Sequence, residues 1–120
     1  MATAFRSRRE AVGRPEDGLR IVLLAKFYRG LGDPTRLRIL ECLLEGEHTV
    51  GELVDLLGSP QGRVSSHLAC LRWCGLVATR PVGRHVYYRV ADPRVRELLA
   101  LGKGMMTANA EHIFACLQIS

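Results

Sequence analysis

The sequence predicts a mainly α fold with a small β component, namely a winged helix-turn-helix of five helices and one β-hairpin wing. Three observations predict it. Apolar residues recur at helical spacing through most of the first 75 residues, with cap residues and glycines dividing them into helices. The pattern then changes to two β-rich runs around a turn. A helical pattern returns for the rest of the chain. Two short helices followed by a hairpin are typical of this fold.

Composition limits the class of protein. A chain of 120 residues with 48% hydrophobic and 24% charged residues indicates one globular domain. No apolar run reaches the roughly 18 residues of a membrane span, and no apolar stretch follows the N-terminal arginines, as a secretory signal would require. We therefore expect a cytoplasmic protein. The net charge of +5 favours a polyanionic partner.

The first segment divides into a polar arm and a helix. Residues 1–17 carry four arginines without helical periodicity, which predicts a flexible basic arm in front of a domain spanning 18–120. This arm is either a solvated tail or a contact to a nucleic-acid backbone. From Leu19 to Gly30 the apolar residues recur at helical spacing and predict the first helix.

Cap residues mark the next two helices. Asp33-Pro34 is an N-cap followed by proline at the first helical position, and Gly46 ends the helix that it opens. Thr49 precedes a shorter helix, and Glu52 three residues later completes a capping box. These two helices supply the first part of a trihelical unit.

The following elements complete the fold. Ser59-Pro60 repeats the arrangement of a cap and a proline, with Ser59 as the expected cap, and predicts a helix over 60–73. Residues 76–80 and 85–90 are β-rich and flank a turn at 81–84, which indicates a hairpin. Asp92-Pro93 opens the final helix, in which two glycines suggest a bend or a close helix contact.

The helix over 60–73 is the expected DNA-reading helix, because the second helix of a helix-turn-helix enters the major groove. Its apolar residues Val64, Leu68 and Leu71 lie at helical spacing and form the buried face, so the polar residues can point outward. A polar helix face without a ligand is the alternative. The predicted reading residues are Gln61, Arg63, Ser65, Ser66 and His67.

The hairpin offers a second contact. Cationic side chains near the tip of a β-ribbon suit phosphate or minor-groove contact, although charges on an edge strand also discourage aggregation. The predicted contact residues of the hairpin are Arg80, Arg84 and His85.

Several strings, in the same order, resemble the ArsR/SmtB family of metal-responsive repressors. They are the segments over 32–40, 64–72, 75–77 and 83–88, beginning with Gly-Asp-Pro-Thr-Arg-Leu-Arg-Ile-Leu, and the likeness extends over roughly residues 20 to 117. The resemblance implies a homodimer formed through the first and last helices. It also implies binding to palindromic double-stranded operator DNA, with release when metal arrives.

The cysteines are the candidate sensor. Cys70 and Cys74 stand four residues apart on the reading helix, so their Cβ atoms lie roughly 5–6 Å apart and both thiols can reach one ion. A tight soft-metal site needs a third thiolate, and Cys116 is the natural donor, from the same subunit or across a dimer. This arrangement is similar to that of the cadmium- and lead-sensing members of the family, which implies these three cysteines as ligands.

The donor set favours soft ions. Three thiolates favour Cd(II) or Pb(II), with Hg(II) or As(III) also suitable, over Zn(II), which usually takes four ligands. His112 lies one turn before Cys116 and could supply a fourth ligand, so zinc stays open. The alternative without a metal is that Cys70 and Cys74 are small core residues. For Cys42, core packing is the better interpretation.

The sequence therefore predicts a repressor, and not an enzyme, whose operator binding ends when a thiophilic ion binds. Two other functions stay open. One is a winged-helix repressor in which the cysteines form a redox switch, and the other is an interaction module with structural zinc. The chain has no nucleophile elbow, phosphate loop or redox Cys-x-x-Cys, and these absences argue against an enzyme.

Overall fold

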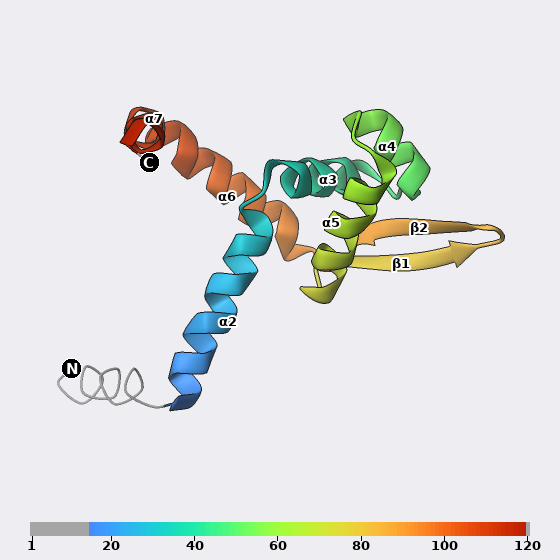
Figure 1. The fold of residues 1–120 in the computed structure, drawn as a ribbon, viewed down its shortest axis with the longest axis horizontal. Coiled ribbons are helices and arrows are strands. Elements are labelled where there is room, and N and C mark those ends of the chain that lie inside the picture. Colours follow the sequence, from blue (N-terminus) through green and yellow to red (C-terminus); the bar gives the residue numbers. More distant parts are fainter. Residues whose placement is uncertain (1–14, 120) are drawn as a thin grey trace.

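The computed structural model describes residues 15–119, which form helices and one two-stranded antiparallel sheet (Figure 1). The predicted winged helix-turn-helix is confirmed. The elements are α2 (Pro15–Leu31), α3 (Pro34–Glu45), α4 (Val50–Leu57), α5 (Gln61–Trp73), β1 (Val77–Val82), β2 (His85–Val90), α6 (Arg94–Ala108) and α7 (Ala110–Ile119). Most of the predicted basic arm, residues 1–14, lies outside the described residues, and α2 begins within its last three positions.

The core lies where α3, α4, α5 and the base of the hairpin meet, a region that we call the reading head (residues 33–91). The buried apolar residues are Ile39, Leu40, Leu43, Leu53, Val64, Leu68, Leu71, Leu76, Val77 and Val95. All of them except Val95 belong to the reading head, and no polar side chain among the described residues is buried with them. Helix α5, the predicted reading helix, is therefore held by apolar packing on its inner face.

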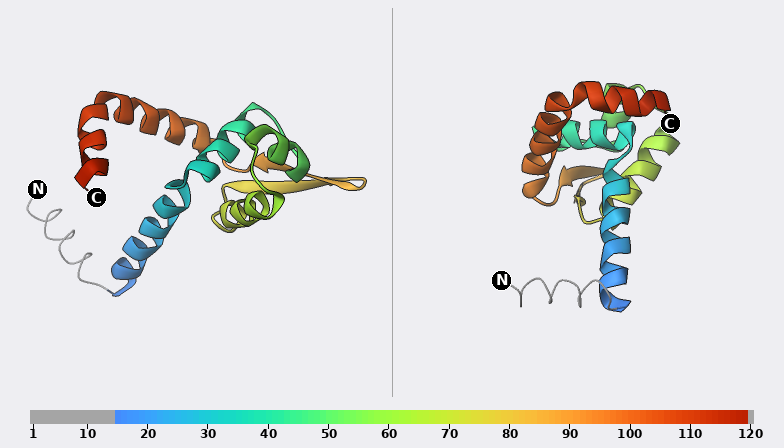
Figure 2. Two further views of the ribbon diagram at one scale, coloured as in Figure 1. Left: turned by 45° about the horizontal axis from the view of Figure 1, so that its top comes forward. Right: turned by 90° about the vertical axis from the view of Figure 1, so that its left-hand side faces the viewer.

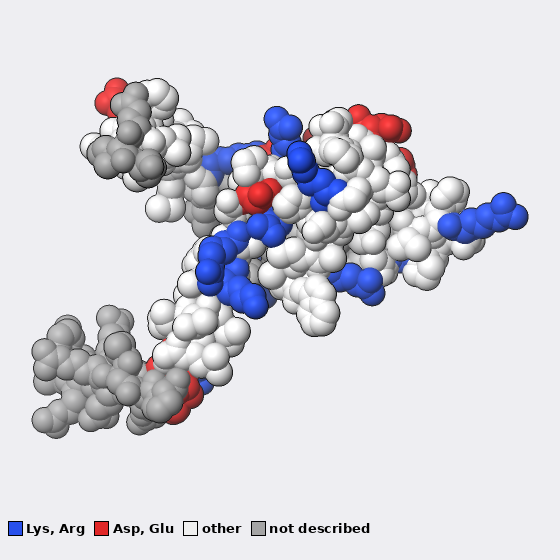
Figure 3. Space-filling view, viewed as in Figure 1, with Lys and Arg blue, Asp and Glu red and all other residues white. Residues whose placement is uncertain are grey.

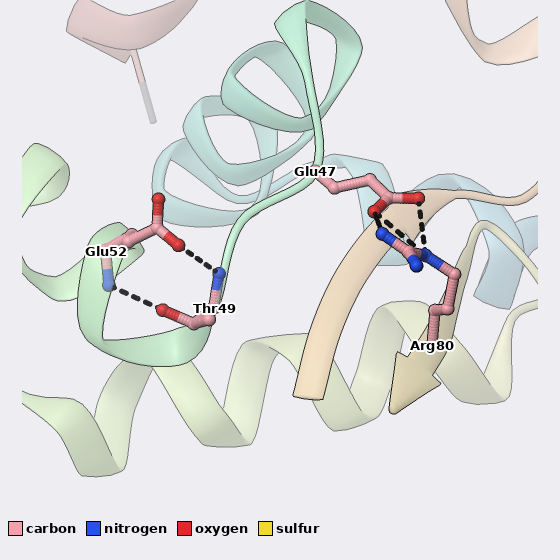
Figure 4. A network of polar contacts seen from close by, with 4 residues as sticks. All are labelled: Glu47, Thr49, Glu52 and Arg80. Atoms are coloured by element: carbon pink, nitrogen blue, oxygen red, sulfur yellow. Dashed lines mark hydrogen bonds and ion pairs between the residues drawn. The ribbon is translucent and has the colours of Figure 1, made fainter. Parts of the chain in front are cut away.

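The cap residues act largely as predicted. The Asp33 carboxylate accepts hydrogen bonds from the amides of Thr35 (2.9 Å) and Arg36 (3.1 Å). Thr49 and Glu52 form the reciprocal capping box, with both hydrogen bonds at 3.2 Å (Figure 4). The prediction that Ser59 caps α5 is wrong. Pro60 occupies the cap position, and no side chain bonds to the amides of the first turn.

The wing is a tighter hairpin than predicted. β1 pairs with β2 from Val77 opposite Val90 to Val82 opposite His85, so only Gly83 and Arg84 form the turn. Gly83 has φ +60°, a left-handed conformation that glycine adopts without strain.

Two arms leave the reading head. α2 forms one arm, α6 and α7 form the other, and they diverge on the side away from the hairpin (Figure 2). The expected final helix is divided at Asn109, so six helices are described in place of five. α6 continues through Gly102 and Gly104, and the break falls after them. Among the described residues, no helix is long and apolar enough to cross a membrane.

Candidate nucleic-acid interface and thiolate site

The outer face of α5 presents polar side chains. Val64, Leu68 and Leu71 are fully buried, which fixes the rotation of the helix about its axis. With that face inward, the predicted reading residues Gln61, Arg63, Ser65 and Ser66 are exposed. Side chains of these types can bond base edges or phosphates, so the first half of α5 has the orientation that major-groove contact requires.

His67 lies differently from the other predicted reading residues. Its side chain is only 20% exposed, and its Nε2 atom lies 3.8 Å from the Asp33 carboxylate. The nearby His67 is a smaller cause of the lowered pKa of Asp33, after the hydrogen bond from the Arg36 amide. His67 therefore joins the start of α3 to the middle of α5.

The predicted wing residues divide into two kinds. Arg84 and His85 are exposed at the end of the hairpin, and a basic side chain projects at its tip (Figure 3). Arg80 instead faces Glu47, with its Nε atom 3.1 Å from Oε2 (Figure 4). Its guanidinium lies 5.7 Å from the centre of the Tyr87 ring. The hydrogen bond from Arg80 lowers the pKa of Glu47. No local sequence pattern indicates this pairing, because 33 positions separate the two residues.

Cys70 and Cys74 occupy the last turn of α5 and its C-cap, and both are half-buried. Cys70 Sγ accepts a hydrogen bond of 2.9 Å from Nη1 of Arg36. Cys74 Sγ lies against α2, so close that a Cβ added at Gly30 would sit 3.4 Å from it. Burial, followed by the neighbouring Cys70, raises the pKa of the Cys74 thiol. The thiol pair therefore lies where α5 meets both α2 and α3.

The third predicted ligand is elsewhere in the protomer. Cys116 is exposed on α7, at the end of the arm that α6 and α7 form, whereas the thiol pair lies on α5 in the reading head (Figure 1). Among residues 15–119, no group of three His, Cys, Asp or Glu side chains is arranged to hold a metal ion. One protomer therefore brings together Cys70 and Cys74 but not Cys116. Cys42 packs against the core, consistent with its interpretation as a core residue.

Comparisons with known proteins identify the family. The family model for "Bacterial regulatory protein, arsR family" matches residues 33–79, which span α3 to β1. Over 95 residues the chain is 44% identical to the "Probable mercury resistance operon repressor" of Streptomyces lividans, covering 79% of this chain and 76% of that protein. The chain belongs to the ArsR family.

Two further proteins are similar to this chain, one in sequence and one in structure. The transcriptional regulator CmtR of Mycobacterium tuberculosis is 47% identical over 76 residues, which are 63% of this chain and 64% of CmtR. The homodimeric winged helix-turn-helix DNA-binding domain of Mb0332 from Mycobacterium bovis superposes with a TM-score of 0.72 at 29% identity. That match covers 82% of this chain and 92% of the Mb0332 domain. The structural comparison thus supports the winged helix-turn-helix fold, and the sequence comparisons support the family of regulators.

Proposed function

We propose that this ArsR-family chain is a metal-responsive transcriptional repressor that binds operator DNA as a homodimer. Binding of a thiophilic ion releases the repressor from DNA. Cd(II) and Pb(II) are the first candidates for this ion, and Hg(II), As(III) and Zn(II) are further candidates. The observation that carries the proposal is a pair of thiols on the reading helix itself. Ligation there acts directly on the element that meets DNA. The name of the Streptomyces relative, a probable mercury resistance operon repressor, supports a thiophilic ion as the signal.

The arms support the homodimer. They hold most of the large apolar side chains that solvent reaches in a single protomer, and an apolar surface of this kind marks an interaction site. The members on α2 are Leu19, Ile21, Val22, Leu23, Leu24 and Tyr28, and those on α6 and α7 are Leu101, Met105, Met106, Ile113, Phe114 and Leu117. We assign these faces to contact with a second copy, as the homodimeric Mb0332 domain illustrates for a relative.

A second copy also offers the missing ligand. We propose that Cys70 and Cys74 of one protomer bind the ion together with Cys116 of the partner subunit. Cys116 lies on the arm that we assign to the dimer contact, away from the thiol pair of its own protomer. Three thiolates suit soft ions. Because thiols must lose their protons to bind metal, and burial raises the pKa of Cys74, the affinity rises with pH.

Release from DNA follows from the position of the site. A metal ion that joins the end of α5 to an arm of the dimer fixes the position of one reading helix relative to the other. Half-site spacing is a geometric constraint, so a small displacement lowers operator affinity. A coupling free energy of ~1–3 kcal/mol is typical between two such sites.

Substitution of Cys70 tests the metal proposal. The reduced protein is titrated with Cd(II), Pb(II), Hg(II) and Zn(II), while thiolate-to-metal absorption and the anisotropy of a fluorescent promoter duplex are followed. We expect C70S to keep DNA binding and to lose metal-induced release. C42S removes a thiol outside the proposed site and serves as the matched control. A full metal response in C70S contradicts the ligand assignment, and metal that copurifies without any effect on DNA binding favours a structural zinc site.

One observation favours a thiol-redox switch as a second candidate. The helix dipole disfavours a thiolate at the C-terminal end of α5, but the Arg36 guanidinium beside Cys70 offsets that effect. Oxidation of Cys70 and Cys74 to a disulfide by peroxide would then distort the end of the reading helix. DNA release by peroxide and not by Cd(II) favours this candidate, whereas release by Cd(II) alone favours the metal sensor.

A further inference from the structure

Arg36 has an unusual environment for an arginine. It belongs to the first turn of α3, and its guanidinium donates from Nη1 to Cys70 Sγ over 2.9 Å. Its Nε–H is shielded from solvent and has no hydrogen-bond partner among the described residues. No carboxylate of residues 15–119 lies within 4.0 Å of this guanidinium, unlike the guanidiniums of Arg80 and Arg94. A thiol sulfur is therefore the principal partner of a partly buried cation.

This arrangement leaves the Arg36 guanidinium without a carboxylate at ion-pair distance among the described residues. A charge removed from water needs a counter-charge and hydrogen bonds to its donors, and a neutral thiol is a weak acceptor. Three thiolates around one divalent ion carry one excess negative charge. An anionic cluster that includes Cys70 would add a counter-charge at hydrogen-bond distance to the weaker Coulombic interaction of Arg36 with the Asp33 carboxylate.

Arg36 also fixes the direction of the sulfur. Groups that hydrogen-bond to a metal ligand orient it and tune its basicity, and their loss typically lowers metal affinity by about 10–100-fold. The backbone of Arg36 is itself held, because its amide donates to the Asp33 carboxylate at the start of α3. The donor to Cys70 is thus anchored on a capped helix of the buried core.

We infer that Arg36 is a positioning residue of the thiolate metal site, acting through its N–H to Sγ hydrogen bond to Cys70. The inference rests on the proposed function, since it assigns a role within the same site. Arg36 orients the sulfur toward the ion and offsets the excess negative charge of the bound cluster. It acts through Cys70 and is not itself assigned as a metal ligand.

Cd(II) titrations of the full chain test this role, with R36M, R36K and R38M compared with wild type. R36M removes both the charge and the donor, whereas R36K keeps a cation. Arg38 is exposed on the same helix, so R38M loses the same charge without touching Cys70. We expect R36M to lower Cd(II) affinity by about 10–100-fold, R36K to lower it less, and R38M to match wild type. The sulfur-to-cadmium absorption band of R36M shifts to longer wavelength, because its thiolate electrons are less stabilised.

The outcomes separate this inference from the metal proposal. If wild type shows no sulfur-to-cadmium band, the proposed function fails and this role fails with it. If wild type shows the band and R36M matches it in affinity and wavelength, only the role of Arg36 is overturned. Equal losses in R36M and R38M also overturn it, because they indicate a general charge effect. Thermal unfolding of the metal-free proteins checks folding, and R36Q replaces R36M if the methionine variant does not fold.

Discussion

The reading head and the two arms use their apolar residues in opposite ways. In the head, leucines such as Leu40, Leu53 and Leu68 are fully buried and surround one core. In the arms, side chains of the same type are exposed, with Leu101 at 66%. Since burial of a leucine stabilises a protein by roughly 1.5–3 kcal/mol, the leucines of the core stabilise the head within one protomer, whereas the exposed leucines of the arms contribute little there.

This contrast explains the distribution of the cysteines. Cys70 and Cys74 belong to the complete region and already lie together, while Cys116 belongs to the incomplete one. If Cys116 of the partner subunit completes the proposed ligand set, that set is assembled only in the dimer. Under that proposal metal occupancy depends on the geometry of the dimer, which would not be so for a site within one head.

The largest expected effect concerns the core of the head. Leu68→Ala removes a fully buried side chain from the inner face of α5 and leaves a cavity. We expect the free energy of unfolding to fall by ~2–5 kcal/mol. Leu56→Ala, at a position on α4 that is 60% exposed, is the comparison and should stay within ~0.5 kcal/mol of wild type. Urea unfolding at one fixed protein concentration measures the free energy of unfolding of both variants. Equal losses would contradict the burial of Leu68 in the core.

The next effect distinguishes the arms from the head. Leu101→Glu places a charge on the arm that we assign to the dimer contact, whereas Leu56→Glu places it at a similarly exposed position of the head. We expect Leu101→Glu to weaken the dimer by at least ~10-fold in dissociation constant, about 1.4 kcal/mol. Leu56→Glu should leave the dimer intact. Sedimentation over a concentration series measures both constants, and a dimer insensitive to Leu101→Glu would remove the arms from the interface.

The same division governs what the sequence could predict. Within the head, apolar spacing and cap residues are local signals, so α3, α4 and the buried face of α5 were predicted correctly. The predicted turn of the wing is too long. Only the pairing of Val82 with His85 shows that the turn consists of Gly83 and Arg84 alone. A polar residue followed by proline predicts a helix cap at both Asp33 and Ser59. Asp33 caps α3, but Ser59 does not cap α5.

The candidate site was less accessible to sequence reasoning. The spacing of Cys70 and Cys74 predicts their common position, because helical geometry is local. Two contacts join residues more than 30 positions apart, namely Arg36 with Cys70 and Arg80 with Glu47. The local sequence around each arginine does not indicate its partner. The position of Cys116 relative to the thiol pair depends on two helices that contact little of their own chain, so no local pattern determines it.

A smaller effect concerns the cap where α2 meets the head. The hydrogen bond from the Arg36 amide is the largest cause of the lowered pKa of Asp33. A carboxylate whose folded pKa is lowered stabilises the fold above its unfolded pKa and loses that contribution as the pH falls through the folded value. Asp33→Ala should cost ~1 kcal/mol at neutral pH. Asp33→Asn keeps an N-cap acceptor and should lose mainly the pH dependence below about pH 4, which thermal unfolding between pH 2 and 7 would show.

The smallest expected effect concerns the wing, where Glu47 and Arg80 form an exposed ion pair. Pairs of this kind contribute little to stability, so Glu47→Gln should leave the melting temperature almost unchanged. Its effect should appear on DNA, because Arg80 loses its carboxylate partner and becomes able to bond a phosphate. We expect a few-fold rise in operator affinity with a steeper salt dependence, measured by anisotropy at several salt concentrations. The double variant with Arg80→Gln should lose the gain, and if it keeps the gain, the effect comes from removing a negative charge and not from releasing Arg80.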